Sequence, residues 1–94
     1  MSDRDGQDRA LVLVVDDEPT SRLLTREALE ESGFSVVDAE DGGTALAAFE
    51  RAHPDLVLLD VDMPVMDGFA VCRTLRKWPA ARYVPIVMVT GRDD

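Results

Sequence analysis

Four short runs rich in apolar residues are spaced along the chain. They cover Leu11–Val15, Phe34–Val37, Leu56–Leu59 and Pro85–Val89. Runs of leucine and β-branched residues are typical of strands that are buried on both faces of a parallel sheet. The pattern therefore predicts four strands.

The segments between these runs carry apolar residues at helical spacing. The first predicted helix begins at Pro19 and ends before Gly33, because proline favours a first helical position and glycine a stop. Its expected apolar stripe consists of Leu23, Leu24, Ala28 and Leu29.

Two further helices are predicted in the same way. One opens at Gly42–Thr44 and has apolar side chains at Ala45, Ala48, Phe49 and Ala52, and His53–Pro54 breaks it. The other begins near Gly68 and ends before Trp78–Pro79, with Gly68, Val71, Cys72 and Leu75 on one side and Arg73, Arg76 and Lys77 on the other.

Alternation of strands and helices of these lengths defines the expected fold class. Right-handed crossovers between parallel strands place helices on both faces of one sheet. We therefore expect an α/β fold with a doubly wound parallel sheet.

Composition limits the classes of function. The 94 residues suffice for one domain, and 46% hydrophobic with 31% charged residues is typical of a soluble globular chain. A formal net charge of -9 argues against non-specific binding to nucleic acid or anionic lipid. A cation is the better expectation for a small partner.

The ends and the single cysteine bear on location. Cys72 alone cannot form an internal disulfide and fits a reducing compartment. Residues 1–10 read as a flexible leader before a domain over 11–94, without the apolar core of a secretion signal. No apolar run approaches the roughly 20 residues of a membrane span, so we expect a cytoplasmic location.

The candidate chemistry lies where the predicted strands end. Asp16 and Asp17 follow the first strand, Asp60 the third and Thr90 the fourth. Ligands of open parallel sheets bind outside the carboxyl ends of the strands. Crowded carboxylates repel one another unless a hard cation compensates them, and Mg²⁺ prefers oxygen ligands.

This arrangement suggests phosphoryl chemistry. A carboxylate can attack a phosphoryl group if a metal and a hydroxyl stabilise the charge that develops. The hypothesis assigns Asp60 as the nucleophile, Asp17 and Asp60 as direct metal ligands, Asp16 as a ligand through water, and Thr90 as the hydroxyl donor.

Four motifs in order resemble those of response-regulator receiver domains, the CheY-like family. They are Val14–Pro19, Asp55–Pro64, Met66–Gly68 and Pro85–Thr90. The resemblance implies a flavodoxin-like receiver fold, a phosphoacceptor at Asp60, an acid pair at Asp16 and Asp17, a metal-binding backbone carbonyl at Asp62 and a switch hydroxyl at Thr90. It also implies a histidine kinase or phosphotransfer protein as partner, and a phosphorylated signalling domain rather than an enzyme.

The chain departs from the family at its end. Family members continue through another helix, a fifth strand that ends in a lysine, and a final helix, whereas the only lysine here is Lys77 in the third predicted helix. We therefore expect a fold that lacks its last strand and last two helices. An open sheet edge and an open sheet face favour self-association, such as a homodimer formed by exchange of elements.

Two other functions were weighed. Leu58–Asp62 also resembles the opening motif of haloacid-dehalogenase-type phosphatases, but Pro64 replaces a threonine or valine there and the acid pair would have no role. The second alternative is a receiver-shaped interaction module that has lost switching.

The basic group of Arg73, Arg76 and Lys77 is a separate feature. It is interpreted as a solvated helix end or, less simply, as a docking surface for a partner.

Overall fold

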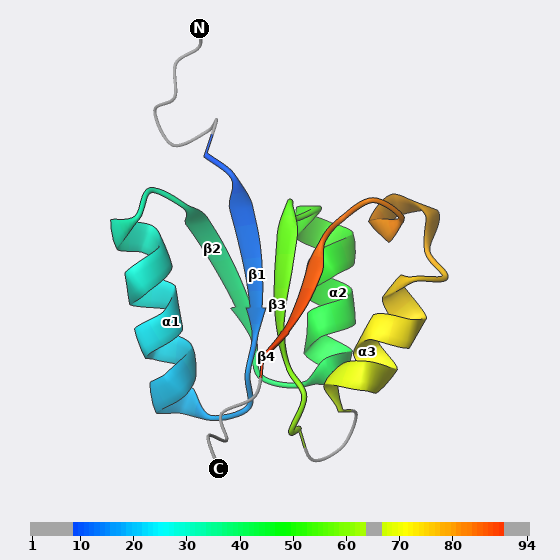
Figure 1. Ribbon diagram of the computed structural model, residues 1–94, viewed down its shortest axis with the longest axis horizontal. Coiled ribbons are helices and arrows are strands. Elements are labelled where there is room, and N and C mark those ends of the chain that lie inside the picture. The colour runs from blue at the N-terminus through cyan, green and yellow to red at the C-terminus, as the bar shows by residue number, and fades with distance from the viewer. Residues whose placement is uncertain (1–8, 64–66, 90–94) are drawn as a thin grey trace, which may run out of the picture.

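A computed structural model describes residues 9–63 and 67–89, and it contains the predicted alternation of strands and helices (Figure 1). The elements are β1 Leu11–Val15, α1 Pro19–Glu31, β2 Ser35–Ala39, α2 Gly42–Ala52, β3 Leu56–Asp60, α3 Gly68–Leu75, the 3₁₀ turn η1 Pro79–Ala81 and β4 Ile86–Val89. The second strand lies one to two residues later than the sequence predicted. Within these ranges no helix has the length and hydropathy needed to span a bilayer.

The four strands form one parallel sheet in the order β2-β1-β3-β4. The chain moves from β1 outward to β2, crosses back to β3 on the other side of β1, and continues outward to β4. The direction of winding thus reverses between β1 and β3, and ligands of such sheets bind at this reversal, beyond the carboxyl ends of the strands. The topology therefore predicts a ligand site at the carboxyl ends of β1 and β3.

Helices cover both sides of the sheet, as predicted for a doubly wound fold. Alternate strand residues point to α2 and α3 and form the larger core, which includes Leu13, Val57, Leu59 and the fully buried Phe49. The other strand residues, Val12, Val14 and Val36, form a smaller cluster with Leu29 on the side of α1. The smaller cluster shows that one helix covers this side only in part.

The predicted apolar stripe of α1 is wrong. Leu23 and Leu24 are 52% and 60% exposed, and Ala28 is exposed as well. Only Leu29 of the expected set packs on the sheet. The face that is half-buried carries Arg22 and Arg26, because these side chains bind partners at the ends of β1 and β2. The sheet-facing side of this helix therefore combines Leu29 with Arg22 and Arg26.

The apolar stripe of α3 follows the prediction. Val71 and Leu75 are fully buried, and Cys72 is half-buried against the larger core. Arg73 of this helix is exposed, as are Arg76 and Lys77 directly after it. The periodic pattern sufficed here because the packed side of the helix is made of apolar side chains that join the larger core.

Acidic residues outside the predicted site cap the N-termini of the three α-helices. The Glu18 carboxylate accepts from the Ser21 N–H, Asp41 forms a capping box with Thr44, and Asp67 accepts from the Ala70 N–H. Side-chain oxygens at these positions satisfy backbone donors that lack a helical partner. These caps fix where each helix starts relative to the strand before it.

Candidate metal and phosphoacceptor site

Three carboxylates meet at the reversal of winding. Asp16 follows β1 and Asp60 ends β3, and these two strands are hydrogen-bonded neighbours with Val15 opposite Leu59. Asp17 extends the group from the turn before α1. One oxygen from each carboxylate lies within 4.8 Å of the others, with Asp17 exposed and Asp16 and Asp60 half-buried. The convergence expected from the sequence is present.

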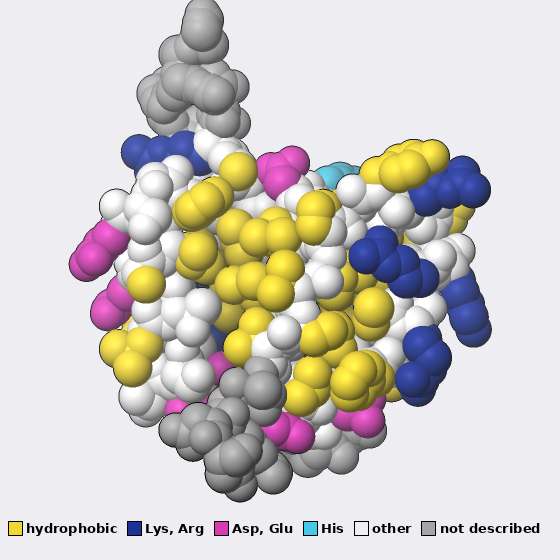
Figure 2. Space-filling model, viewed as in Figure 1, with side chains coloured by type: hydrophobic (Ala, Val, Ile, Leu, Met, Phe, Trp, Pro, Cys, Tyr) yellow, Lys and Arg dark blue, Asp and Glu magenta, His cyan; other side chains and the backbone are white. Residues whose placement is uncertain are grey.

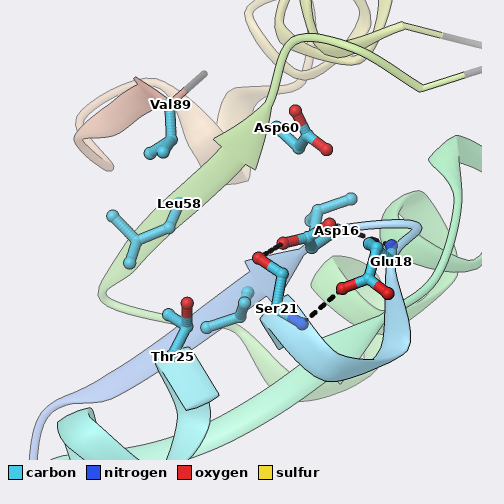
Figure 3. Close-up of a pocket in the computed structure, with 9 residues that line it drawn as sticks. Asp16, Glu18, Ser21, Thr25, Leu58, Asp60 and Val89 are labelled. Carbon is cyan, nitrogen blue, oxygen red and sulfur yellow. Dashed lines mark hydrogen bonds between the residues drawn. The ribbon is translucent and has the colours of Figure 1, made fainter. Parts of the chain in front are cut away.

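The Asp16 carboxylate is held at both of its oxygens. The backbone N–H of Glu18 donates to Oδ1 over 3.0 Å, and the hydroxyl of Ser21 donates to Oδ2 over 2.6 Å. Figure 3 shows the Ser21 side chain reaching from the first turn of α1 to Asp16. Donors on both oxygens fix the rotation of the carboxylate. Ser21 was not among the residues predicted from the sequence, because a hydroxyl five residues from an aspartate is not a recognisable motif.

An arginine fixes the backbone at the same point. Arg22 Nη1 donates to the carbonyl of Asp16 over 2.8 Å, and its Nε lies 3.8 Å from Asp38 Oδ2 near the end of β2. Arg26 Nη1 approaches the same Asp38 oxygen at 3.4 Å. Asp38 therefore links α1 to the sheet edge that carries the acids. This support was also absent from the sequence-based prediction.

Asp60 is held in an unfavourable environment for a negative charge. Burial raises the pKa of its carboxyl, and the negative charges of Asp16 and Asp17 raise it further. The N–H of Asp62 donates to Oδ1 over 2.9 Å and opposes this rise by stabilising the charged form. A bound cation would relieve the same repulsion.

Gly68 allows α3 to begin against the end of β3. A Cβ at this position would clash with the carbonyl oxygen of Asp60 and lie 2.9 Å from the Cα of Val61. Only glycine tolerates such a close approach between two backbone segments. Gly68, predicted from the sequence as part of an apolar stripe, thus also sets the position of the Asp60 backbone.

A pocket of about 370 Å³ opens beside the acids, on the side of the sheet that α1 covers. Asp16 and Asp60 line its rim, with Ser21 and Thr25 from α1, and Leu58 and Val89 form apolar walls (Figure 3). Asp16 and Asp60 are therefore reachable from solvent through this hollow, whereas Asp17 is exposed outside it.

The donor set fits Mg²⁺. All three converging side chains offer carboxylate oxygens, which hard divalent cations prefer, and no sulfur or imidazole ligand joins this group among the described residues. Exposure of Asp17 and half-exposure of the other two leave room for the water ligands that Mg²⁺ retains.

The remaining predicted site residues are placed only in part. Asp62 lies in the turn after β3 with its side chain exposed, and it contacts Asp60 through its N–H. Thr90, the expected switch hydroxyl, lies outside the described residues, directly after β4. Pro64 and Met66, two of the motif residues, also lie outside them.

Comparison with known proteins identifies the class that this fold and site define. Residues 12–94 match the family model of the response regulator receiver domain. The chain belongs to the response regulator receiver domain family. The resemblance stated from the four motifs is thereby confirmed, and the phosphatase alternative gains no support.

Particular relatives are similar over most of the chain. Response regulator PleD of Caulobacter vibrioides is 46% identical over 89% of this chain, and protein PilH of Pseudomonas aeruginosa is 38% identical over 90% of it. The chain spans 18% of the length of PleD and 33% of the probable transcriptional regulator ycf27 of Porphyridium aerugineum.

Solved structures agree with the fold. Chemotaxis protein CheY4 of Vibrio cholerae superimposes with a TM-score of 0.86 at 36% identity, covering 92% of this chain and 72% of its own. Response regulator TrrA of Thermotoga maritima, solved in complex with Mg²⁺ and BeF, has a TM-score of 0.83 at 38% identity, covering 89% and 71%. The expected receiver fold is confirmed for the part of the chain that the structure describes.

Proposed function

We propose that this chain is a phosphoacceptor module of a two-component signalling system, which takes a phosphoryl group onto Asp60 in the presence of Mg²⁺. The observation that carries the proposal is the convergence of Asp16, Asp17 and Asp60, with ligand oxygens within 4.8 Å of one another. Family membership supports it, since receiver domains interact with histidine kinases or phosphotransfer proteins.

Each carboxylate has a distinct part in the proposed chemistry. Asp17 and Asp60 would hold the ion directly, Asp16 through water, and the carbonyl of Asp62 would complete the protein ligands. When bound, Mg²⁺ neutralises the acids and the phosphoryl oxygens that approach them. The similarity to a receiver solved with Mg²⁺ and BeF supports this choice of metal.

The transfer step is a displacement at phosphorus. A carboxylate oxygen of Asp60 attacks, the bond from phosphorus to the donor's histidine nitrogen breaks, and that nitrogen keeps the bonding electrons and takes a proton. The N–H of Asp62 on Oδ1 holds Asp60 in one orientation and leaves Oδ2 as the attacking atom. Thr90 would donate its hydroxyl to a phosphoryl oxygen.

Intact-mass measurement after incubation with acetyl phosphate and Mg²⁺ tests the proposal. We expect the mass of one phosphoryl group, lost in Asp60→Asn and in chelator, and retained in Glu50→Gln, which removes an exposed carboxylate of α2. Failure of the folded wild-type chain to gain this mass would instead support the interaction module that has lost switching.

A further inference from the structure

We propose that the surface hollow beside η1 binds an acidic segment of a partner polypeptide. The hollow is lined by Arg76, Lys77, Trp78, Pro79 and Arg82 and encloses about 190 Å³. It lies at the amino end of β4, whereas the acid cluster lies at the carboxyl ends of the strands. The proposal is therefore independent of phosphorylation at Asp60.

Charge is distributed very unevenly along this chain. Residues 68–89 contain Arg73, Arg76, Lys77 and Arg82 and no aspartate or glutamate, although the whole chain has a net charge of -9. In Figure 2 the basic side chains gather over the side of the molecule formed by α3 and η1. A positive surface on an acidic protein attracts an anionic partner and orients it.

Three of the four cations of this surface are available to bind a partner. Arg73, Lys77 and Arg82 are exposed, and none of them forms an ion pair with a described residue. Arg82 instead lies over the ring of Tyr83, 5.8 Å from its centroid, and Tyr83 is 87% exposed. Unpaired guanidinium and ammonium groups bind carboxylates through charge-assisted hydrogen bonds.

Contacts within the chain hold Trp78 and Arg76, two residues that line the hollow. Trp78 packs edge-on against the buried Phe49, with ring centroids 6.1 Å apart. Arg76 Nη1 donates to the carbonyls of Ala81 and Val84 over 3.0 and 3.1 Å, which fixes the loop between η1 and β4. A surface organised before binding loses little conformational entropy when a partner docks.

The lining favours a polypeptide over a nucleic acid. The Trp78 indole and the Pro79 ring line the hollow together with the cations, so it can accept an apolar side chain as well as carboxylates. A nucleic acid needs positive potential over a longer path, and the negative charge of the rest of the chain opposes it. An acidic peptide with one aromatic side chain fits both the cations and the apolar side chains that line the hollow.

Trp78 is the only tryptophan in the chain and lines the hollow, so its emission reports binding directly. The probe is a peptide of glutamates that flank one phenylalanine, titrated at low ionic strength. We expect saturable quenching that weakens at least ~10-fold in Lys77→Glu/Arg82→Glu, a loss of about 1.4 kcal/mol or more. Arg9→Glu/Arg51→Glu makes the same change of net charge at exposed positions elsewhere and should retain the wild-type affinity.

Four results would overturn the proposal. They are equal weakening in the two double variants, equal binding of a peptide with alanine in place of glutamate, tighter binding of oligothymidylate, and sedimentation that shows these cations holding a second copy of the chain. Circular dichroism of each variant checks that both remain folded, and Lys77→Gln/Arg82→Gln provides a milder change if charge reversal unfolds the chain.

Discussion

Ser21 links the start of α1 to the acid cluster. Its N–H donates to the Glu18 carboxylate that caps the helix, and its hydroxyl donates to Asp16 Oδ2. One residue therefore takes part in the helix cap and also orients a carboxylate. Donors to the ligands of a metal site fix their orientation and are worth ~10- to 100-fold in affinity. The proposed metal site should therefore depend on this hydroxyl.

Replacing Ser21 with alanine should weaken Mg²⁺ binding about tenfold, because Asp16 loses one of the two donors that fix its rotation. Ser21→Thr keeps the hydroxyl and should bind nearly as the wild type does. Thr20→Ala removes an exposed hydroxyl one residue earlier and is the matched control. Calorimetric titration with MgCl₂ measures all four; equal affinities for wild type and Ser21→Ala would contradict the role of Ser21.

The charge on Asp60 should make the metal-free fold less stable at neutral pH. Its pKa lies above the ordinary value of 3.8 in the folded chain, so the folded state binds the proton more tightly than the unfolded state. The free energy of unfolding therefore falls as the pH rises from 3.8 through the raised pKa of Asp60. Below the ordinary pKa of 3.8 the Asp60 carboxyl is protonated in both the folded and the unfolded state, so it does not lower the stability of the fold.

Asp60→Asn removes this charge and keeps an oxygen for the Asp62 N–H. We expect a melting temperature a few degrees above wild type at pH 7 without Mg²⁺, and a difference that shrinks as pH falls toward the ordinary value. Thermal denaturation followed by circular dichroism gives both temperatures. A variant that melts at or below the wild-type temperature at pH 7 would show that the ionised Asp60 does not destabilise the fold.

At the scale of elements, the apolar runs were sufficient to predict the strands and the existence of each helix. A run such as Leu56–Leu59 is typical of a strand in a parallel sheet, although Leu56 and Leu58 are only half-buried on the side of α1. The acids that follow such parallel strands share one edge of the sheet. That is why Asp16, Asp17 and Asp60 could be placed together from the sequence. At these positions the order of apolar run and acid along the chain is enough to place the acids at one edge of the sheet.

The rotation of α1 could not be predicted in this way. Its leucines suggested one face, but the side toward the sheet combines Leu29 with Arg22 and Arg26, which contact Asp16 and Asp38. Contacts of this kind join residues that are close only after β1 and β2 pair. Ser21 and the close approach of Gly68 to the Asp60 carbonyl depend on the assembled fold for the same reason.

At the scale of the whole molecule, one side of the sheet is covered less than the other. Val87 and Val89 of β4 are 45% and 44% exposed on the side of α1, and Figure 2 shows hydrophobic side chains spread across the middle of this face. Among the described residues β4 pairs only with β3, which leaves its other edge open. Open edges and apolar surfaces of this kind favour association.

We therefore predict that this chain self-associates through β4 and the adjoining face. Sedimentation velocity at micromolar concentration should show dimers or larger species, and Val87→Lys should shift the chain toward monomer because it places a charge within the contact. Phe69→Lys places the same charge on the exposed side of α3 and should have no such effect. A monodisperse wild-type monomer would rule out this association.

The proposed phosphoacceptor site requires three carboxylates that share one divalent ion. Titration with MgCl₂, followed by calorimetry in wild type, Asp17→Asn and Asp60→Asn, tests this most directly. We predict one site in the wild type and at least ~10-fold weaker binding in each variant, because each removes a direct carboxylate ligand. Folded wild-type chain that binds no Mg²⁺, or binds it as well without Asp17 or Asp60 as with them, would contradict the account.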